Sequence, residues 1–222
     1  MPGGTAALLV LADGRFPAGG HAHSGGAEAA VKSGRVHDAA SLQEFCTSRL
    51  HTAGLTAAAL AAAAAAGADP LALDEAADAR TPSPALRRTA RKLGRQMMRA
   101  ARATWPGPEL DALAAARPKG AHQPVVLGLA ARSAGLTPLD AAYAAAYENV
   151  SGPATAAVRL LSLDPFDATA VLARLTPGIE EVARRAEAAG RGPVDDLPAA
   201  SAPLLEITAE QHAAWPVRLF AS

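Results

Sequence analysis

Apolar residues recur along this chain at intervals of three and four, the spacing that places them on one face of an α-helix. The clearest example follows Asp38, where the stripe holds Leu42, Phe45, Cys46 and Leu50. It continues past Gly54 into an alanine run at residues 57–66. No stretch of useful length alternates apolar and polar residues as a half-buried strand would. The pattern therefore predicts an all-α fold.

Helix starts are marked by a Ser, Thr or Asp followed by proline, because the first residue caps the amide groups and proline suits the first helical position. Five such pairs are Asp69-Pro70, Ser83-Pro84, Thr137-Pro138, Asp164-Pro165 and Thr176-Pro177, and His122-Gln123-Pro124 opens a sixth stretch. The stretch at 137–163 is interrupted at Ser151-Gly152-Pro153, where we expect a kink or a break. We predict a single-domain bundle of about eight to ten helices.

The C-terminal part of the chain has a different composition. Residues 191–203 are rich in Gly, Pro, Ala and Asp, which is typical of a flexible linker. Residues 204–222, the C-terminal tail, carry the large apolar residues Leu205, Ile207, Trp215, Leu219 and Phe220. Such groups suit a binding anchor. We expect a helical domain at 1–190, a linker at 191–203 and a flexible, partner-binding tail at 204–222.

Composition narrows the classes of function. Half of the 222 residues are apolar but only 4% are aromatic, and the 21 basic side chains match 21 acidic ones. A neutral chain has no overall field that would draw it to nucleic acid or to an anionic membrane. The longest apolar run is too short to span a bilayer, and the single cysteine, Cys46, cannot form an intrachain disulfide. We expect a cytoplasmic protein that binds neither nucleic acid nor membrane.

Residues 13–28, the opening segment, form a glycine-dense loop that runs into a helix. Such loops can bind phosphate, but this one lacks the Lys-Ser/Thr ending of a P-loop and follows no predicted strand. The alternative is a tight turn with Ser24 as helix cap and Glu28 in the first helical turn. His21 and His23 are weak candidates for a metal site, for instance at a symmetric dimer interface.

The helix after Ser83-Pro84 is strongly basic. Its cationic residues, with no acidic residue between them, are Arg87, Arg88, Arg91, Lys92, Arg95, Arg99 and Arg102. These groups form either a solvated face or a docking surface for an acidic partner, which arginine would bind through paired hydrogen bonds. Nucleic acid fits less well, because few aromatic side chains are present for stacking.

The sequence offers little for catalysis. Cys46 lies on the apolar stripe of its helix, where a thiol is usually inert. The chain has no Gly-X-Ser-X-Gly motif, and no pair of carboxylates differs from ordinary helix-surface charges. We therefore predict a protein that is not an enzyme, with no catalytic residue and no cofactor.

Short motifs follow the opening segment in order along nearly the whole chain. They are Leu93-Gly94-Arg95-Gln96, His122-Gln123-Pro124-Val125-Val126-Leu127-Gly128, Ala156-Ala157-Val158-Arg159-Leu160-Leu161 and Arg218-Leu219-Phe220. Together with the opening segment, these motifs resemble those of the UreF family of urease accessory proteins. Several motifs in one order are far more specific than any of them alone.

The resemblance implies an all-α homodimer that joins the accessory protein UreD, also called UreH, and the GTPase UreG. These proteins would together assist GTP-dependent nickel insertion at the carbamylated lysine of apo-urease. The residues expected to bind partners are Ser24, Gly25, Gly26, Glu28, Arg95, Gln96, His122, Gln123, Pro124, Arg159, Arg218, Leu219 and Phe220. The alternative is an independent nickel-binding metallochaperone that uses His21 and His23.

Overall fold

The computed structural model describes residues 4–200 and 202–222, and over these residues it confirms an all-α fold without strands. The helices are α1 Thr5–Leu11, α2 Ala27–Lys32, α3 Ala39–Arg49, α4 Leu55–Ala66, α5 Pro70–Ala79, α6 Pro84–Thr104, α7 Pro108–Ala116, α8 Gln123–Ser133, α9 Pro138–Leu161, α10 Pro165–Gly190 and α11 Pro203–Ala213. A π-helical turn, Leu50–Gly54, joins α3 to α4 without a break, as the sequence pattern predicts. The described part thus holds ten continuous helices in one compact domain.

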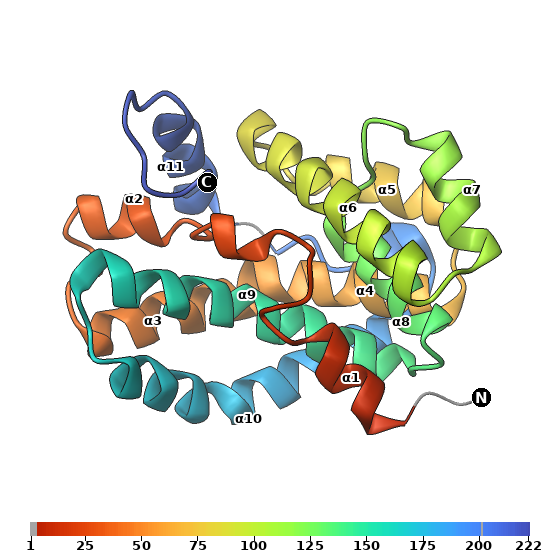
Figure 1. Ribbon diagram of the computed structural model, residues 1–222, viewed down its shortest axis with the longest axis horizontal. Coiled ribbons are helices and arrows are strands. Elements are labelled where there is room, and N and C mark those ends of the chain that lie inside the picture. Colours follow the sequence, from red (N-terminus) through yellow and green to blue (C-terminus); the bar gives the residue numbers. More distant parts are fainter. Residues whose placement is uncertain (1–3, 201) are drawn as a thin grey trace.

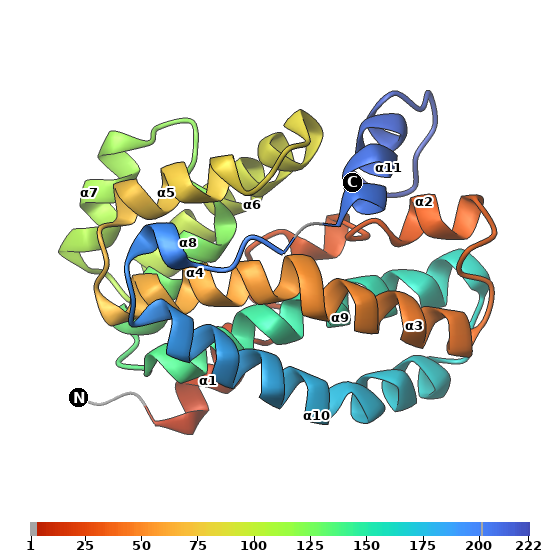
Figure 2. The same cartoon turned by 180° about the vertical axis from the view of Figure 1, so that it is seen from behind.

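Helix α4 forms the centre of the bundle and packs against α8, α9 and α10 (Figures 1 and 2). Nearly all of its side chains are buried, and most are alanines. Small residues let the helix backbones come close: a Cβ on Gly128 of α8 would lie 2.2 Å from the carbonyl oxygen of Ala61. The core is therefore filled by closely packed backbones and aliphatic side chains, which explains the low aromatic content.

Four of the predicted Ser/Thr/Asp-Pro starts are real helix starts. Their capping side chains accept backbone amides of the first turn at Asp69, Ser83, Thr137 and Asp164. The predicted start at Thr176-Pro177 is wrong, because Pro177 lies inside α10. Proline leaves the carbonyl of Ala173 without its helical donor, but both residues are exposed and water can bond that carbonyl. The apolar stripe of α10 passes through this point at Leu175 and Ile179.

Helix α9 also continues through its internal proline, so the break considered for residues 151–153 does not occur. Pro153 has no N–H to donate to the carbonyl of Asn149, one turn earlier. The side chain of Arg49 supplies the missing donor, with Nε 2.9 Å from that oxygen. Arg49 ends α3 immediately before the π-helical turn. A tertiary contact thus stabilises α9 where its own sequence disfavours a helix.

The segment that leads to the C-terminal tail runs along α5. The guanidinium of Arg80 donates to the carbonyls of four of its residues, which are Val194, Asp195, Leu197 and Pro198. Leu197 is buried in the core, whereas Ser201 lies outside the described residues. The division into domain, linker and tail remains a prediction.

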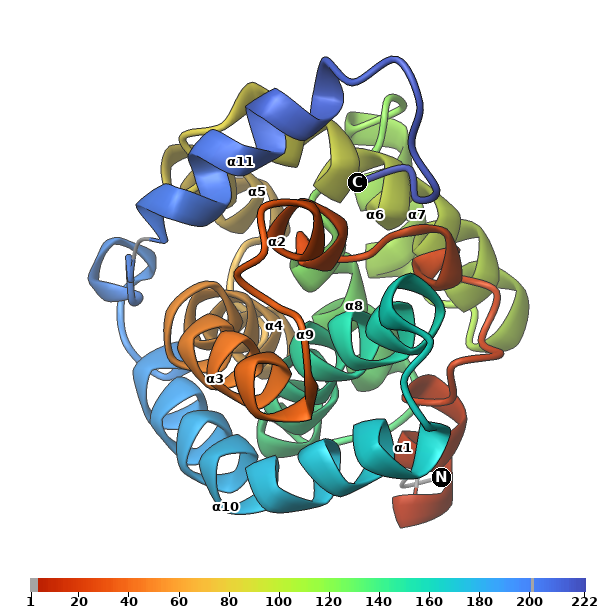
Figure 3. The same cartoon turned by 90° about the vertical axis from the view of Figure 1, so that its left-hand side faces the viewer.

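Helix α11 packs across α6 and α2 (Figure 3). Its carboxylates bond the amino end of α6: Glu206 accepts the N–H of Ser83 at 2.6 Å, and Glu210 accepts the N–H of Ala85 at 2.7 Å. Acidic groups are favourable there because the first amides of a helix lack intrahelical acceptors. These bonds position the first half of the C-terminal tail.

Candidate protein-interaction site

The opening segment and the end of the chain lie side by side (Figure 3). The N–H and the Oγ of Ser24 both donate to the carbonyl of Ser222, at 2.7 and 2.8 Å. The N–H of Ala221 donates to the carbonyl of Ala22 at 2.8 Å, and Nδ1 of His23 lies 2.7 Å from the Ser222 hydroxyl. The first and last motifs of the sequence therefore form one structural unit.

Glu28 holds this unit together from α2. Its buried carboxylate accepts the N–H groups of Leu219 at 2.8 Å and of Phe220 at 3.1 Å, and Nε2 of His212 lies 2.8 Å away. Burial acts to raise the pKa of Glu28, but these hydrogen bonds outweigh it and hold that pKa below its ordinary value. Glu28 lies in the first turn of α2, as predicted, and its carboxylate also fixes the C-terminal tail.

Ser24, by contrast, is not the N-cap residue that the sequence predicted. The N-cap position of α2 is Gly26, while Ser24 accepts the N–H of Glu28 through its Oγ at 3.2 Å. Gly25 and Gly26 have φ angles of +59° and +91°, which favour glycine. A Cβ on Gly26 would lie 2.5 Å from Leu205 of α11. The two glycines therefore let the opening segment touch the C-terminal tail closely.

The Leu93-Gly94-Arg95-Gln96 motif lies on α6, against the loop that enters α8. A Cβ on Gly94 would lie 1.9 Å from the carbonyl oxygen of Ala121, so only glycine allows this contact. Arg95 is exposed. The Oε1 atom of Gln96 is buried beside Gly19 and has no hydrogen-bond partner among the described residues. The motif thus combines one packing residue with one exposed cation.

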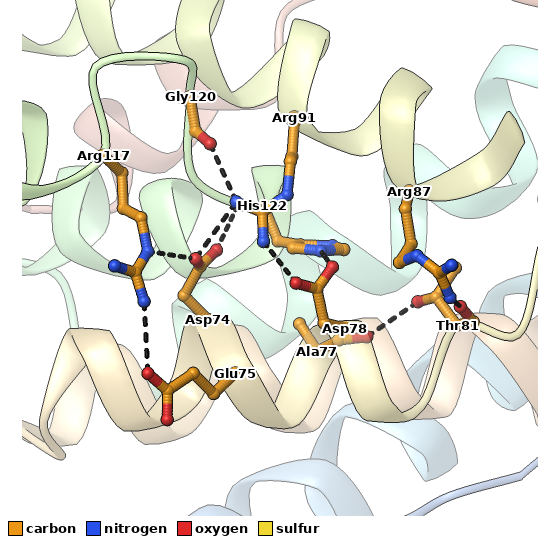
Figure 4. A network of polar contacts seen from close by, with 10 residues as sticks. All are labelled: Asp74, Glu75, Ala77, Asp78, Thr81, Arg87, Arg91, Arg117, Gly120 and His122. Carbon is orange, nitrogen blue, oxygen red and sulfur yellow. Dashed lines mark hydrogen bonds and ion pairs between the residues drawn. The ribbon is translucent and has the colours of Figure 1, made fainter. Parts of the chain in front are cut away.

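His122 belongs to a buried polar network that joins α5, α6 and α8 (Figure 4). The completely buried carboxylate of Asp74 accepts the His122 N–H at 2.7 Å, Arg117 Nε at 2.7 Å and Arg91 Nη1 at 3.1 Å. Nε2 of His122 lies 2.7 Å from Asp78. Burial lowers the pKa of His122 despite this carboxylate, so the ring is neutral near pH 7. His122 lies inside the fold, and a partner role for it remains a prediction.

The next residues, Gln123 and Pro124, open α8. Gln123 reaches a cleft of about 440 Å³ between the opening segment and α9, which we call the central cleft. There its Nε2 donates to Glu148 at 2.5 Å. Burial raises the pKa of Glu148 to about 7, although the Gln123 bond opposes the shift. Glu148 was not among the residues predicted from the sequence. It could have been found as the one carboxylate between Ala146 and Val150, which are both buried.

The other predicted contact residues form a partly exposed surface around the tail. Arg159, Arg218 and Leu219 are exposed, whereas Phe220 is buried. The Arg159 guanidinium lies 5.3 Å from the centre of the Phe220 ring, a cation–π contact. Phe220 therefore packs into the protein and the residues beside it face outward.

Helix α6 carries a row of exposed cations that we call the basic stripe, formed by Arg88, Lys92, Arg95 and Arg99. Among the described residues, none of the four has an acidic side chain within ion-pair distance. By contrast, Arg91 pairs with Asp74 and Asp78, and Arg102 pairs with Asp111. The helix therefore divides most of its cations between ion pairs within the chain and one unpaired face, while Arg87 donates to the carbonyls of Thr81 and Pro82.

His21 is exposed at the rim of the central cleft and His23 is buried in its wall. Burial, helped by the nearby charges of Lys92 and His21, lowers the pKa of His23 to about 4, so that ring is neutral. In the described part of the chain, no three His, Cys, Asp or Glu residues cluster closely enough to hold a metal ion. Burial raises the pKa of the Cys46 thiol to about 11, in keeping with an inert side chain.

Known proteins are similar to this chain over nearly its whole length. The family model described as UreF matches residues 36–176. The chain belongs to the UreF family. Relatives named urease accessory protein UreF include those of Mycolicibacterium vanbaalenii, 46% identical with 98% of each chain covered, and of Mycobacterium sp. strain JLS, 44% identical with 97% of each covered. That of Mycobacterium tuberculosis H37Rv is 40% identical, with 93% of each covered.

Membership of the UreF family confirms the resemblance seen in the motifs and gives the chain an accessory role in urease maturation. Such a role is that of a helper protein rather than a catalyst. In residues 4–200 and 202–222, no helix is both long enough and apolar enough to cross a membrane. Some residues of the UreF motifs make contacts within this chain, and others are exposed at its surface.

Proposed function

We propose that this UreF-family protein joins UreD, also called UreH, and the GTPase UreG, and assists GTP-dependent nickel insertion into apo-urease. In this proposal the protein acts by binding its partners and catalyses no reaction itself. The observation that carries the proposal is the C-terminal tail, which is anchored to the opening segment and still exposes large apolar groups. We also propose that the protein is cytoplasmic and forms a homodimer, as the family resemblance implies.

The exposed apolar groups of the tail are Leu204, Ile207, Val217 and Leu219, each with more than half of its surface accessible. Leu204 and Ile207 are three residues apart and therefore share a face of α11. Groups of large exposed apolar residues mark protein interfaces, because a partner that covers them removes apolar surface from water. This supports a protein partner, for which we propose UreD.

The basic stripe supports a second contact, which we propose for UreG. Unpaired arginines suit an acidic protein surface, since a guanidinium forms paired hydrogen bonds with a carboxylate. Arg95 lies inside a family motif and is exposed at the middle of the stripe. Exchanging Arg95 for Glu should lower UreG-dependent urease activation and leave helical circular dichroism unchanged.

The proposal is tested by capture of purified UreD. The double variant Leu204→Ser, Ile207→Ser should capture much less UreD than the unchanged protein, and deletion of residues 204–222 should also weaken capture. The matched control is Phe166→Ser, because Phe166 is 82% exposed at the start of α10, away from the tail. Equal capture by all variants would remove the tail from the interface.

The alternative of an independent nickel chaperone is favoured by one observation, the neutral ring of His23, since neutral imidazole is the form that binds metal. Equilibrium dialysis with nickel separates the two functions. Tight binding that disappears in a His21→Ala, His23→Ala variant would support the chaperone. Because three ligands do not cluster in the described residues, such binding would need ligands from a second copy.

A further inference from the structure

Arg49 presents a partly buried cation to the central cleft. Its Nε is used by the carbonyl of Asn149. Among the described residues, its two Nη atoms have no hydrogen-bond acceptor, and no acidic side chain lies within ion-pair distance of the guanidinium. Burial lowers the pKa of Arg49, as expected of a charge that has lost water and gained no counter-charge. A desolvated guanidinium of this kind favours an anion from outside the chain.

The other ionisable groups of the cleft do not neutralise Arg49. Asp13 is paired with Arg15 at 2.7 Å. Glu148 bonds to Gln123, and because burial raises its pKa to about 7, a large share of its carboxyl groups is uncharged at neutral pH. A second cation, Arg159, lines the same cleft. The cleft therefore carries a surplus of positive charge.

The cleft has room for a small ligand beside the Arg49 guanidinium, and its lining includes uncharged hydrogen-bond donors. The guanidinium carbon lies 3.6 Å from where a Cβ on Gly25 would be, so glycine keeps this side of the arginine open. Ser151 and Thr155 contribute hydroxyl groups to the lining. Apolar walls from Phe16 and Pro153 lower the local polarity, which strengthens a charge-assisted hydrogen bond.

We propose that the central cleft is a carboxylate-binding site in which the Nη atoms of Arg49 hold the two oxygens of the ligand. A planar guanidinium suits a carboxylate because two parallel N–H groups match its two oxygens. The carboxylate comes either from a free small acid or from a Glu or Asp side chain of a partner protein. Only the second source rests on the proposed function.

The test follows the Nε–H resonance of Arg49 by NMR in ¹⁵N-labelled full-length protein. Acetate, succinate and the blocked peptide Ala-Glu-Ala are titrated separately, with Ala-Gln-Ala and sodium chloride at equal ionic strength as controls. We expect a saturable shift with carboxylates and none with the controls. Stronger binding of the small acids identifies a metabolite site, whereas stronger binding of the peptide identifies a contact with a partner side chain.

Two variants locate the site. Thr155→Trp narrows the cleft from an exposed position on α9 and should abolish the shift while Arg49 keeps its bond to Asn149. Arg49→Lys retains a charged donor but loses the paired geometry, and should weaken binding about tenfold. Because this variant lacks the Nε–H probe, its affinity is compared with that of the unchanged protein by isothermal titration calorimetry. The control Arg184→Lys changes an exposed arginine of α10 that pairs with Glu180.

Absence of a saturable shift, equal shifts with chloride, or unchanged binding in Thr155→Trp would overturn the proposal. Thermal unfolding of each variant shows whether it is folded, and Thr155→Trp keeps the test decisive if Arg49→Lys is unstable. Because ligand binding is measured on the isolated protein, its failure is distinct from a failure to capture UreD.

Discussion

The Nε–H of Arg49 lies 2.9 Å from the carbonyl oxygen of Asn149, the acceptor that an uninterrupted helix would pair with the amide of residue 153. Because residue 153 is proline, this arginine completes α9 from a neighbouring helix. The same side chain extends into the central cleft. Arg49 therefore both stabilises α9 and lines the cleft next to the opening segment.

This relationship predicts that the effects of Arg49 and Pro153 are coupled. Arg49→Met should lower the free energy of unfolding by about 1–3 kcal/mol, because a partly buried carbonyl loses its donor. In a Pro153→Ala background the loss should be smaller, since alanine restores the backbone N–H. Urea unfolding of the four proteins measures the coupling. Purely additive losses would mean that the Arg49 bond does not replace the missing amide.

Glu28→Gln should release the C-terminal tail. In Glu28, one carboxylate oxygen accepts the N–H of Leu219 and the other accepts the N–H of Phe220. The amide of glutamine has only one oxygen, so one of these two N–H groups loses its acceptor. We expect their hydrogen exchange to accelerate about tenfold or more, corresponding to a loss of about 1.4 kcal/mol or more. The control is Glu44→Gln on the exposed face of α3. Unchanged protection in Glu28→Gln would show that other contacts hold the tail.

The same bond makes the tail sensitive to acid. The pKa of Glu28 is lowered in the folded protein, so its stabilisation is fully present above the unfolded value of 4.5. It is lost as the pH falls through the lower folded value. Protection of the Phe220 amide should therefore decrease below pH 4.5 in the unchanged protein and vary less in Glu28→Gln.

Asp74→Asn should be strongly destabilising. The buried carboxylate faces Arg91, Arg117 and the amide of His122, and its loss leaves two partly buried cations short of a counter-charge. We expect a cost of about 3–5 kcal/mol in unfolding by urea. The neighbouring Glu75→Gln serves as control, because the Glu75 side chain is 76% exposed and contacts only one of these arginines. Similar costs for both variants would contradict the role of burial.

Glu148→Gln should stabilise the protein in a pH-dependent way. The pKa of Glu148 is raised from 4.5 to about 7, so the unfolded chain loses this proton before the folded protein does. The free energy of unfolding of the unchanged protein therefore decreases as the pH rises from 4.5 to 7. Glutamine does not ionise, and the gain should be absent at pH 4.5 and on the order of 2 kcal/mol at pH 8. An equal gain at both pH values would argue against ionisation as the cause.

Two glycine positions should respond in opposite ways to alanine. Gly94→Ala places a Cβ 1.9 Å from the Ala121 oxygen, so α6 must move away from the loop before α8, and we expect a loss of about 2 kcal/mol or more. A Cβ on Gly152 meets no atom of another part of the chain within 4 Å, and Gly152→Ala should stabilise α9 by at most about 0.5–1 kcal/mol, because the ring of Pro153 crowds the preceding residue. Thermal unfolding of both variants measures the difference. A loss for Gly152→Ala would mean that glycine is required there for another reason.

Local chemistry in the sequence determined much of the fold. The caps at Asp69, Ser83, Thr137 and Asp164 act on amides two or three residues away, so their helices could be predicted without tertiary information. The stripe after Asp38 and the alanine run also predicted α3 and α4 correctly. The opening segment, in order with the later motifs, was enough to predict the family.

Tertiary structure decided the remaining features, because their causes are distant in the chain. Pro177 lies within a helix because its position is exposed, and α9 passes Pro153 because Arg49, about a hundred residues earlier, supplies a donor. The carboxylate of Glu28 bonds amides 191 and 192 residues away. Sequence spacing describes neighbours along a helix, whereas desolvation and hydrogen bonding between distant segments depend on how the helices pack.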